Sequence, residues 1–270
     1  MWKTSVVIAP GTAVQAPAPL KGSLADTIAR ASRIGFDAVQ FTVHRPAEFD
    51  LEGARAALAA HRVQASGIAT GAAYAVDRIS LGHGEEGRRR AAVARMKEHI
   101  DLARELGGAD VVIGLIRGTY ADCRSREQFM GQYRASLGEC LAHAERRRIR
   151  IVHEAIGRHD SDVLRTIAEN IPFISGFGSP WFRLQIDTYH MALEETDGNA
   201  AVRSAKGLLA QVDISDAGRT APDGRRFDFP GLMKALAHIG YEDHLVFEFR
   251  TSGDGVAEAK AGLDYIRSLA

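Results

Sequence analysis

Short runs of β-branched and apolar residues alternate with stretches of helical periodicity eight times along this chain of 270 residues. Most of the runs are apolar on both faces, which is typical of strands that lie buried inside a parallel sheet. Eight strand–helix units favour an α/β fold with one domain over residues 1–270, a single (β/α)8 TIM barrel. The expected strands are Lys3–Ala9, Ala38–Val43, Gln64–Ala69, Asp110–Ile116, Arg148–His153, Arg183–Asp187, Leu209–Ile214 and His244–Phe249.

Two local features at the start of the chain concern its first helix and the turn after its first strand, and the second favours the barrel over an open, doubly wound sheet. Ser23 precedes the first helical stretch and Gly35 follows it, as expected for the two ends of a helix. A doubly wound sheet would be expected to carry a glycine-rich phosphate turn after its first strand. Gly11 is followed instead by Thr-Ala-Val-Gln. The sequence therefore predicts no nucleotide-binding turn here.

The charge balance argues against two classes of partner. Lys plus Arg and Asp plus Glu both number 34, so the formal net charge is zero. A neutral chain lacks the long-range field that attracts nucleic acid or anionic lipid. The sequence has no apolar run near the roughly 20 residues of a membrane helix and no signal-peptide pattern. We therefore expect a cytoplasmic protein with no nucleic-acid or membrane partner.

An acidic residue lies at or near the carboxyl end of each of the last four expected strands: Glu154, Asp187, Asp213 and Glu248. Strand alternation turns these side chains inward, at the barrel face that carries active sites. Four carboxylates would repel one another in a mouth of low dielectric, and a divalent cation would remove that conflict. Oxygen ligands suit Mn²⁺ or Mg²⁺ better than Zn²⁺. We expect one such ion on these four acids, with unconnected caps and ion pairs as the alternative.

Two further residues lie close to these acids in sequence. His190 follows Asp187 by three residues in DTYHM, and Arg219 follows the seventh strand in SDAGR. Because His190 leaves the same strand end as an expected ligand, a substrate contact is favoured over a purely structural role. An arginine beyond a strand end can bind the distal oxygens of a ligand. A surface ion pair is the alternative for Arg219.

Several longer segments resemble one enzyme family over nearly the whole chain. DTYHMALEE is the most specific, and SDAGR, FDFPGLMKALAHIGY, ATGAAYAVDRISL and GADVVIGLIRG agree with it. The sequence resembles the sugar phosphate isomerase/epimerase family with the xylose isomerase-like TIM barrel. Within it, the chain is most similar to ketose 3-epimerases and to keto-sugar-acid epimerases of the 5-keto-gluconate type. The resemblance implies a sugar or sugar-acid substrate and a homodimer or homotetramer.

The resemblance also implies roles for single residues. Glu154 and Glu248 match glutamates that hold the metal and exchange protons with the substrate, and Asp187 matches a pure metal ligand. The chain departs from the family at Asp213, where relatives usually have histidine, and at Gly157 and Asp160 in the segment AIGRHD, in which Arg158 is retained. The residues matched to or expected at the substrate are His190, Arg219, Asp160 and Arg158.

These roles predict an epimerase that removes a proton beside a ketone and returns one on the opposite face, through a metal-stabilised enediolate. An aldose–ketose isomerase of the hydroxypyruvate type and an inosose-type dehydratase are alternatives that would use the same site. A non-catalytic sugar-binding protein is a third alternative, suggested by Asp213 and Gly157. An endonuclease acting at abasic DNA sites would need more histidine ligands and a basic surface, so it is disfavoured.

Overall fold

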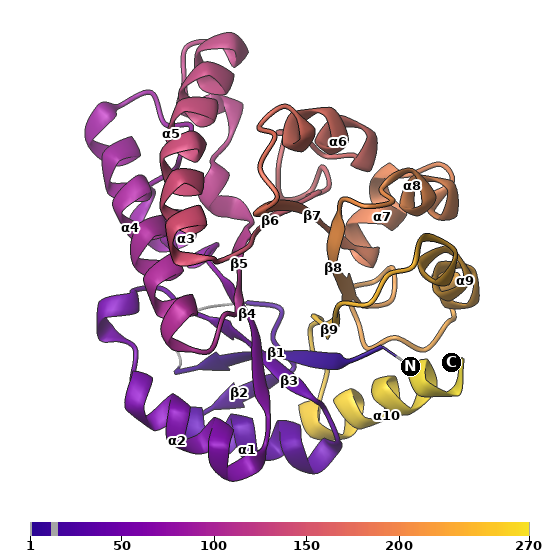
Figure 1. Cartoon of the computed structure of the whole chain (residues 1–270). Coiled ribbons are helices and arrows are strands. Elements are labelled where there is room, and N and C mark those ends of the chain that lie inside the picture. The colour runs from indigo at the N-terminus through magenta and orange to yellow at the C-terminus, as the bar shows by residue number, and fades with distance from the viewer. Residues whose placement is uncertain (1, 12–15, 270) are drawn as a thin grey trace.

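The computed structural model describes residues 2–11 and 16–269. Its parallel strands close into a barrel, because β1 pairs with β3 on one side and with β9 on the other. Helices surround this barrel on the outside (Figure 1). The expected α/β (β/α)8 fold is confirmed. The barrel strands are β1 (Thr4–Pro10), β3 (Ala38–Thr42), β4 (Gln64–Ala69), β5 (Asp110–Ile113), β6 (Ile151–Glu154), β7 (Phe182–Asp187), β8 (Leu209–Ile214) and β9 (Leu245–Phe247).

Capping residues mark both ends of the helix over Leu24–Ile34. Ser23 Oγ accepts a hydrogen bond from the Asp26 N–H at 3.3 Å, and Gly35 ends the same helix with a φ of 110°. Only glycine adopts that backbone conformation at little cost, so the predicted helix end is confirmed. The helices are α1 (Leu24–Ile34), α2 (Leu51–His61), α3 (Ala72–Asp77), α4 (Glu86–Glu105), α5 (Arg126–Arg147), α6 (Ile167–Ser175), α7 (Thr188–Glu194), α8 (Gly198–Ser204), α9 (Phe229–Ile239) and α10 (Gly255–Ser268), with short 3-10 helices η1 (Pro46–Glu48), η2 (Leu115–Arg117) and η3 (Tyr120–Asp122).

Two strand boundaries differ from the sequence prediction by three residues, and one strand was not predicted. The strand expected over 110–116 ends at Ile113, and η2 occupies the rest of that apolar run. The strand expected from Arg148 begins at Ile151, because Arg148 takes the left-handed conformation that ends α5. A short strand that the sequence did not predict, β2 (Leu20–Gly22), pairs with β1. Residues 12–15, where no phosphate turn was expected, lie outside the described residues.

The strand register sets the acidic side chains at matching heights. Glu154 is paired with Gln185, and Asp187 is paired with Asp213 on the next strand.

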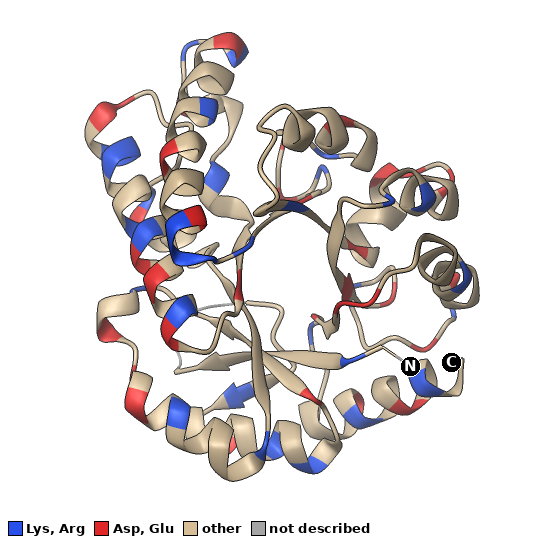
Figure 2. Cartoon of the chain, viewed as in Figure 1, with Lys and Arg blue, Asp and Glu red and all other residues tan. Residues whose placement is uncertain are grey.

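Basic and acidic segments are interspersed over the outer helices (Figure 2). Among the described residues, no helix combines the length and the apolar character that crossing a membrane requires.

Candidate active site

The four predicted acids gather at the carboxyl end of the barrel. Glu154 and Asp187 are the last residues of β6 and β7, Asp213 lies one residue before the end of β8, and Glu248 directly follows β9. Asp187 and Asp213 are almost completely buried, and the side chains of Glu154 and Glu248 are 10% and 12% exposed. Consecutive strands of the barrel therefore deliver four carboxyl groups to one region with little access to water.

A cavity of about 220 Å³ opens at this end of the barrel. One wall is polar and comes from β6 to β9 and the loops that follow them. The opposite wall consists mostly of small and apolar side chains from the first half of the barrel, including Ala72 and Ala75 of α3. The expected site residues that line the cavity are Glu154, Asp160, His190, Asp213, Arg219 and Glu248.

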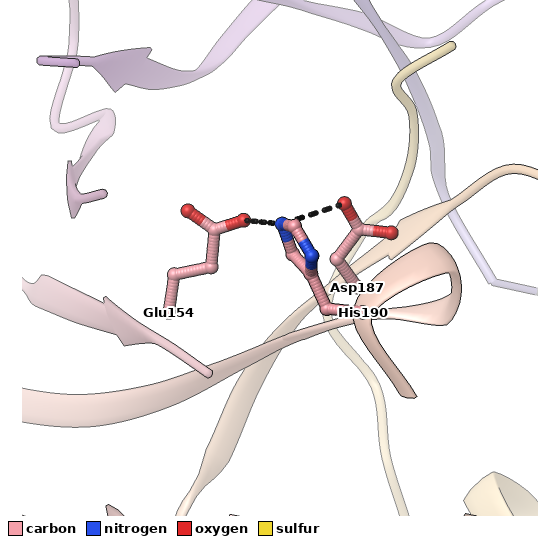
Figure 3. Close-up of side chains that lie close together, drawn as sticks. All are labelled: Glu154, Asp187 and His190. Atoms are coloured by element: carbon pink, nitrogen blue, oxygen red, sulfur yellow. Dashed lines mark ion pairs between the residues drawn. The ribbon is translucent and has the colours of Figure 1, made fainter. Parts of the chain in front are cut away.

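Three side chains at this end of the barrel could together hold a metal ion, and two of them, Glu154 and His190, line the cavity. Among the described residues, ligand atoms of Glu154, Asp187 and His190 all lie within 4.8 Å of one another. His190 Nε2 lies 3.5 Å from Glu154 Oε1 and 3.8 Å from Asp187 Oδ2 (Figure 3). Asp187 Oδ2 is buried and accepts no hydrogen bond from the described residues. Its cationic neighbours, Arg219 Nη2 at 3.6 Å and His190 Nε2, lie beyond hydrogen-bond distance, so this buried oxygen fits a bound cation.

Asp213 has a different environment from the other acids. Its Oδ2 accepts a hydrogen bond from Gln185 Nε2 at 2.8 Å, and its Oδ1 accepts one from Gln211 Nε2 at 2.7 Å. Gln211 Nε2 also donates to Gln40 Oε1 at 2.8 Å. Asp213 and Glu248 do not belong to the compact group of three, although both line the same cavity. Strand alternation in the sequence places these two glutamines inward, each two positions before an acidic site residue, but it assigns them no role.

Arg219 connects the acids of the polar wall. Its Nη2 lies 2.7 Å from Glu248 Oε2, and its Nη1 lies 3.2 Å from Asp160 Oδ2. The guanidinium carbon lies 4.9 Å from the centre of the Tyr189 ring. These contacts hold the Arg219 guanidinium at the boundary between the buried carboxylates and the mouth of the cavity.

Arg158 is the one expected site residue that the structure places apart from the others. Its side chain is 54% exposed, and its Nε donates to Glu194 Oε1 at 2.8 Å. Arg158 is also absent from the described residues that line the cavity. A substrate contact by Arg158 therefore stays a prediction from the sequence.

The chain matches the model of the xylose isomerase-like TIM barrel family over residues 28–269. It belongs to this family. An L-ribulose 3-epimerase of Mesorhizobium japonicum is 29% identical over 238 residues, which are 84% of this chain and 76% of the relative. A ketose 3-epimerase of Arthrobacter globiformis is 28% identical over 229 residues, covering 82% and 76% of the two chains. The predicted resemblance to ketose 3-epimerases is confirmed.

Solved structures agree on the fold of this xylose isomerase-like barrel. A crystal structure of D-allulose 3-epimerase from Methylomonas sp. in complex with D-allulose superposes with a TM-score of 0.84. The two chains are 21% identical, and the match covers 99% of this chain and 98% of the other. At this identity, the superposition supports the shared barrel fold only.

In this family member, the two glutamates of the cavity have opposite pKa shifts. Burial raises the pKa of Glu248 to about 7, since the negative charges of Asp187 and Glu154 add to it and Arg219 only partly offsets it. Burial alone would also raise the pKa of Glu154, but the neighbouring imidazole of His190, together with the positive charges of Arg117 and Arg219, outweighs it and lowers that pKa. A carboxyl group with a raised pKa beside one with a lowered pKa forms a pair suited to general acid–base chemistry.

Proposed function

We propose that this chain is a divalent-metal-dependent epimerase of a ketose or a keto-sugar acid, an enzyme of the sugar isomerase and epimerase type. The observation that carries the proposal is the pair Glu154 and Glu248, which line one cavity from two strand ends beside a group that fits a cation. The names of the relatives, L-ribulose 3-epimerase and ketose 3-epimerase, support the same chemistry.

The proposed ion is Mn²⁺ or Mg²⁺, because the proposed ligands Glu154, Asp187, Asp213 and Glu248 are all carboxylates. When bound, the ion supplies positive charge that makes a proton beside the substrate ketone easier to remove. His190 lies within 4 Å of both Glu154 and Asp187, so its imidazole is a further candidate for contact with the ion or with a substrate oxygen.

The protein's own groups move the proton. In the proposed reaction, one of Glu154 and Glu248 removes a proton from the carbon next to the ketone, which gives an enediolate. The other glutamate donates a proton to the opposite face of that carbon, so the configuration is inverted. Arg219 and Asp160 would orient the substrate from the mouth, and Arg158 could reach the substrate only if it left Glu194.

Two carboxyl groups from different strands favour epimerisation over the alternatives. An aldose–ketose isomerase and an inosose-type dehydratase would share the enediolate but differ in where the hydrogen goes. We propose the epimerase because the relatives carry epimerase names and because two separate glutamates can serve the two faces of one carbon.

The test follows hydrogen exchange in D₂O with metal-loaded protein and a panel of ketoses and keto-sugar acids. We expect deuterium at the carbon that is inverted, and Glu154→Gln or Glu248→Gln should lower turnover by about 100-fold or more, because each removes a group that transfers a proton. Glu242→Gln, at an exposed residue outside the cavity, is the matched control. Full activity in both glutamine variants would refute the assignment of acid and base.

Four further predictions from the sequence belong with this proposal. They are a single domain over residues 1–270, a cytoplasmic location, a homodimer or homotetramer, and no partner of nucleic acid or membrane. Light scattering combined with size-exclusion chromatography measures the assembly directly.

A further inference from the structure

Almost every charged side chain that lines the cavity has a partner within the protein. Glu154 lies beside His190, and Arg219 pairs with both Glu248 and Asp160. Asp213 accepts a hydrogen bond on each of its two oxygens. Most charged side chains of the polar wall therefore already have partners within the protein before any substrate binds.

Arg250 is the exception on this wall. It lines the cavity, its side chain is exposed, and its guanidinium makes neither an ion pair nor a hydrogen bond with residues 2–11 and 16–269. The residues outside those ranges include no Asp or Glu. The backbone is nevertheless fixed, because the Arg250 N–H donates to the Arg219 carbonyl oxygen at 2.8 Å. An arginine with an anchored backbone thus lines the cavity, and its guanidinium has no partner among the residues that the structure describes.

The position of Arg250 relative to Glu248 indicates which part of a substrate it would contact. Both residues line the cavity, whereas the intervening Phe249 is fully buried. These residues follow the carboxyl end of β9, where Arg250 is exposed and the Glu248 side chain is only 12% exposed, and two residues of chain span at most about 7 Å. The Arg250 guanidinium therefore belongs to a part of the cavity farther toward the mouth than the Glu248 carboxyl. A group bound there lies beyond the carbons that Glu248 would serve.

We infer that the substrate carries an anionic group at the end remote from its reacting carbons, and that Arg250 binds this group. The inference rests on the proposed function, because it assigns a substrate class to the same cavity. A planar guanidinium with several donors suits both carboxylate and phosphate, so the shared chemistry is a terminal oxyanion. Arg219 is less suited to this role, because its guanidinium is already held by Glu248 and Asp160.

The experiment compares three compounds with one carbon skeleton: D-fructose, its 6-carboxylate D-fructuronate, and D-fructose 6-phosphate. With metal-loaded wild-type protein, we expect kcat/KM to be higher for at least one anionic compound than for the neutral ketose. The two anionic arms separate a sugar acid from a sugar phosphate. Binding of the same compounds, measured by calorimetry, provides a second readout that does not require turnover.

Arg250→Gln should lower the ratio of anionic to neutral kcat/KM, and the same ratio of affinities, by about 10- to 100-fold, as expected for loss of a charged hydrogen-bond donor. Arg250→Lys should give ratios between those of the wild type and of Arg250→Gln, since lysine keeps the charge but loses the bidentate geometry. Arg225→Gln is the matched control, because this arginine pairs with Asp223 outside the cavity and its side chain is 84% exposed.

Three results would overturn the inference. They are a preference for D-fructose in the wild type, an unchanged ratio in Arg250→Gln, and equal affinity of the wild type for charged and neutral compounds. In the first two cases turnover still supports the proposed epimerase. Loss of all turnover and of all deuterium exchange would instead count against the proposed function, and the affinities would still test Arg250.

Discussion

Asp213 differs from the other three acids of the site, because both of its carboxylate oxygens already accept hydrogen bonds from side-chain amides. The amides of Gln185 and Gln211 donate without adding charge. A carboxylate oxygen can accept more than one hydrogen bond, so each oxygen of Asp213 keeps capacity for a second partner. Burial raises the pKa of Asp213 well above its ordinary value, and the charges of Glu248, Asp187 and Glu154 raise it further. A cation close by would favour the ionised carboxylate.

The first prediction concerns Asp213 as a metal ligand. Asp213→Asn should weaken Mn²⁺ binding by at least about tenfold, because it removes a negative charge while keeping the shape of the side chain. Asp213→His should shift preference toward Zn²⁺, which accepts imidazole nitrogen more readily than Mg²⁺ does. Calorimetric titration with each ion measures both effects. Asp160→Asn, which removes a carboxylate held by Arg219, is the charge-matched control. Unchanged Mn²⁺ affinity in Asp213→Asn would mean that Asp213 is not a ligand.

The sequence predicted only in part which side chains come together in the candidate site. The positions of Glu154, Asp187, Asp213 and Glu248 followed from strand ends, because alternation and the barrel's carboxyl face leave few choices. Whether a side chain turns into the cavity depends on tertiary partners, which one sequence does not specify. Arg158 illustrates this, since Glu194 from α7 holds its guanidinium on the outside.

At the scale of elements, β6 has an arginine at each end, one fully buried and one with its side chain 28% exposed. Arg117, from η2, is fully buried and donates to the carbonyl oxygens of Glu154, Gly114, Ile113 and Val163. Arg150, just before the strand, pairs with Asp110 at 2.7 Å and with Asp243 at 2.8 Å. Arg117 therefore fixes the strand end that carries Glu154, whereas Arg150 fixes the opposite end of the barrel.

The second prediction uses this pair. Arg117→Met should cost about 2 to 5 kcal/mol of unfolding free energy, because it leaves buried carbonyl oxygens unsatisfied. Arg150→Met should cost about 1 to 3 kcal/mol, because it removes the partner of the buried Asp110 side chain but also of the partly exposed Asp243. Only Arg117→Met should also lower kcat and weaken Mn²⁺ binding in protein that circular dichroism shows to be folded. Arg117→Lys should recover part of the loss, since an ammonium group can still donate to some of the same carbonyls. Equal kcat per folded molecule in both methionine variants would restrict Arg117 to a structural role.

The same region explains why element boundaries were harder to predict than elements. The apolar run over 110–116 fits a strand, yet Gly114 lets the chain turn into η2, which places Arg117 beneath Glu154. An apolar run alone does not distinguish these conformations. Strand β2 was not expected, because Leu20–Gly22 has only three residues and depends on β1 for its hydrogen bonds.

At the scale of the whole molecule, the order of strands was the most predictable feature. Parallel strands that follow one another through helices pair in sequence order, and right-handed crossovers leave few other arrangements. Closure through β1 and β9 then brings the first and last strands together, so that residues near both ends of the sequence contribute to one cavity. Pro17 and Arg250 both line it, although more than 200 positions separate them.

The last prediction links the cavity to the stability of the barrel. A cation held by Glu154 and Asp187 would join the ends of β6 and β7, so it binds the folded chain much more tightly than the unfolded one. At an ion concentration of about 100 times Kd, this linkage contributes about 2.7 kcal/mol, which corresponds to roughly 5 to 10 °C in Tm for a chain of this size. Removing the ion with a chelator should lower Tm by that amount, and added Mn²⁺ should restore it. Asp187→Asn should keep its hydrogen bond to the Tyr189 N–H, because asparagine caps helices as well as aspartate does, yet its Tm should no longer respond to Mn²⁺. A wild-type Tm that is insensitive to both chelator and Mn²⁺ would contradict a metal site between these strands.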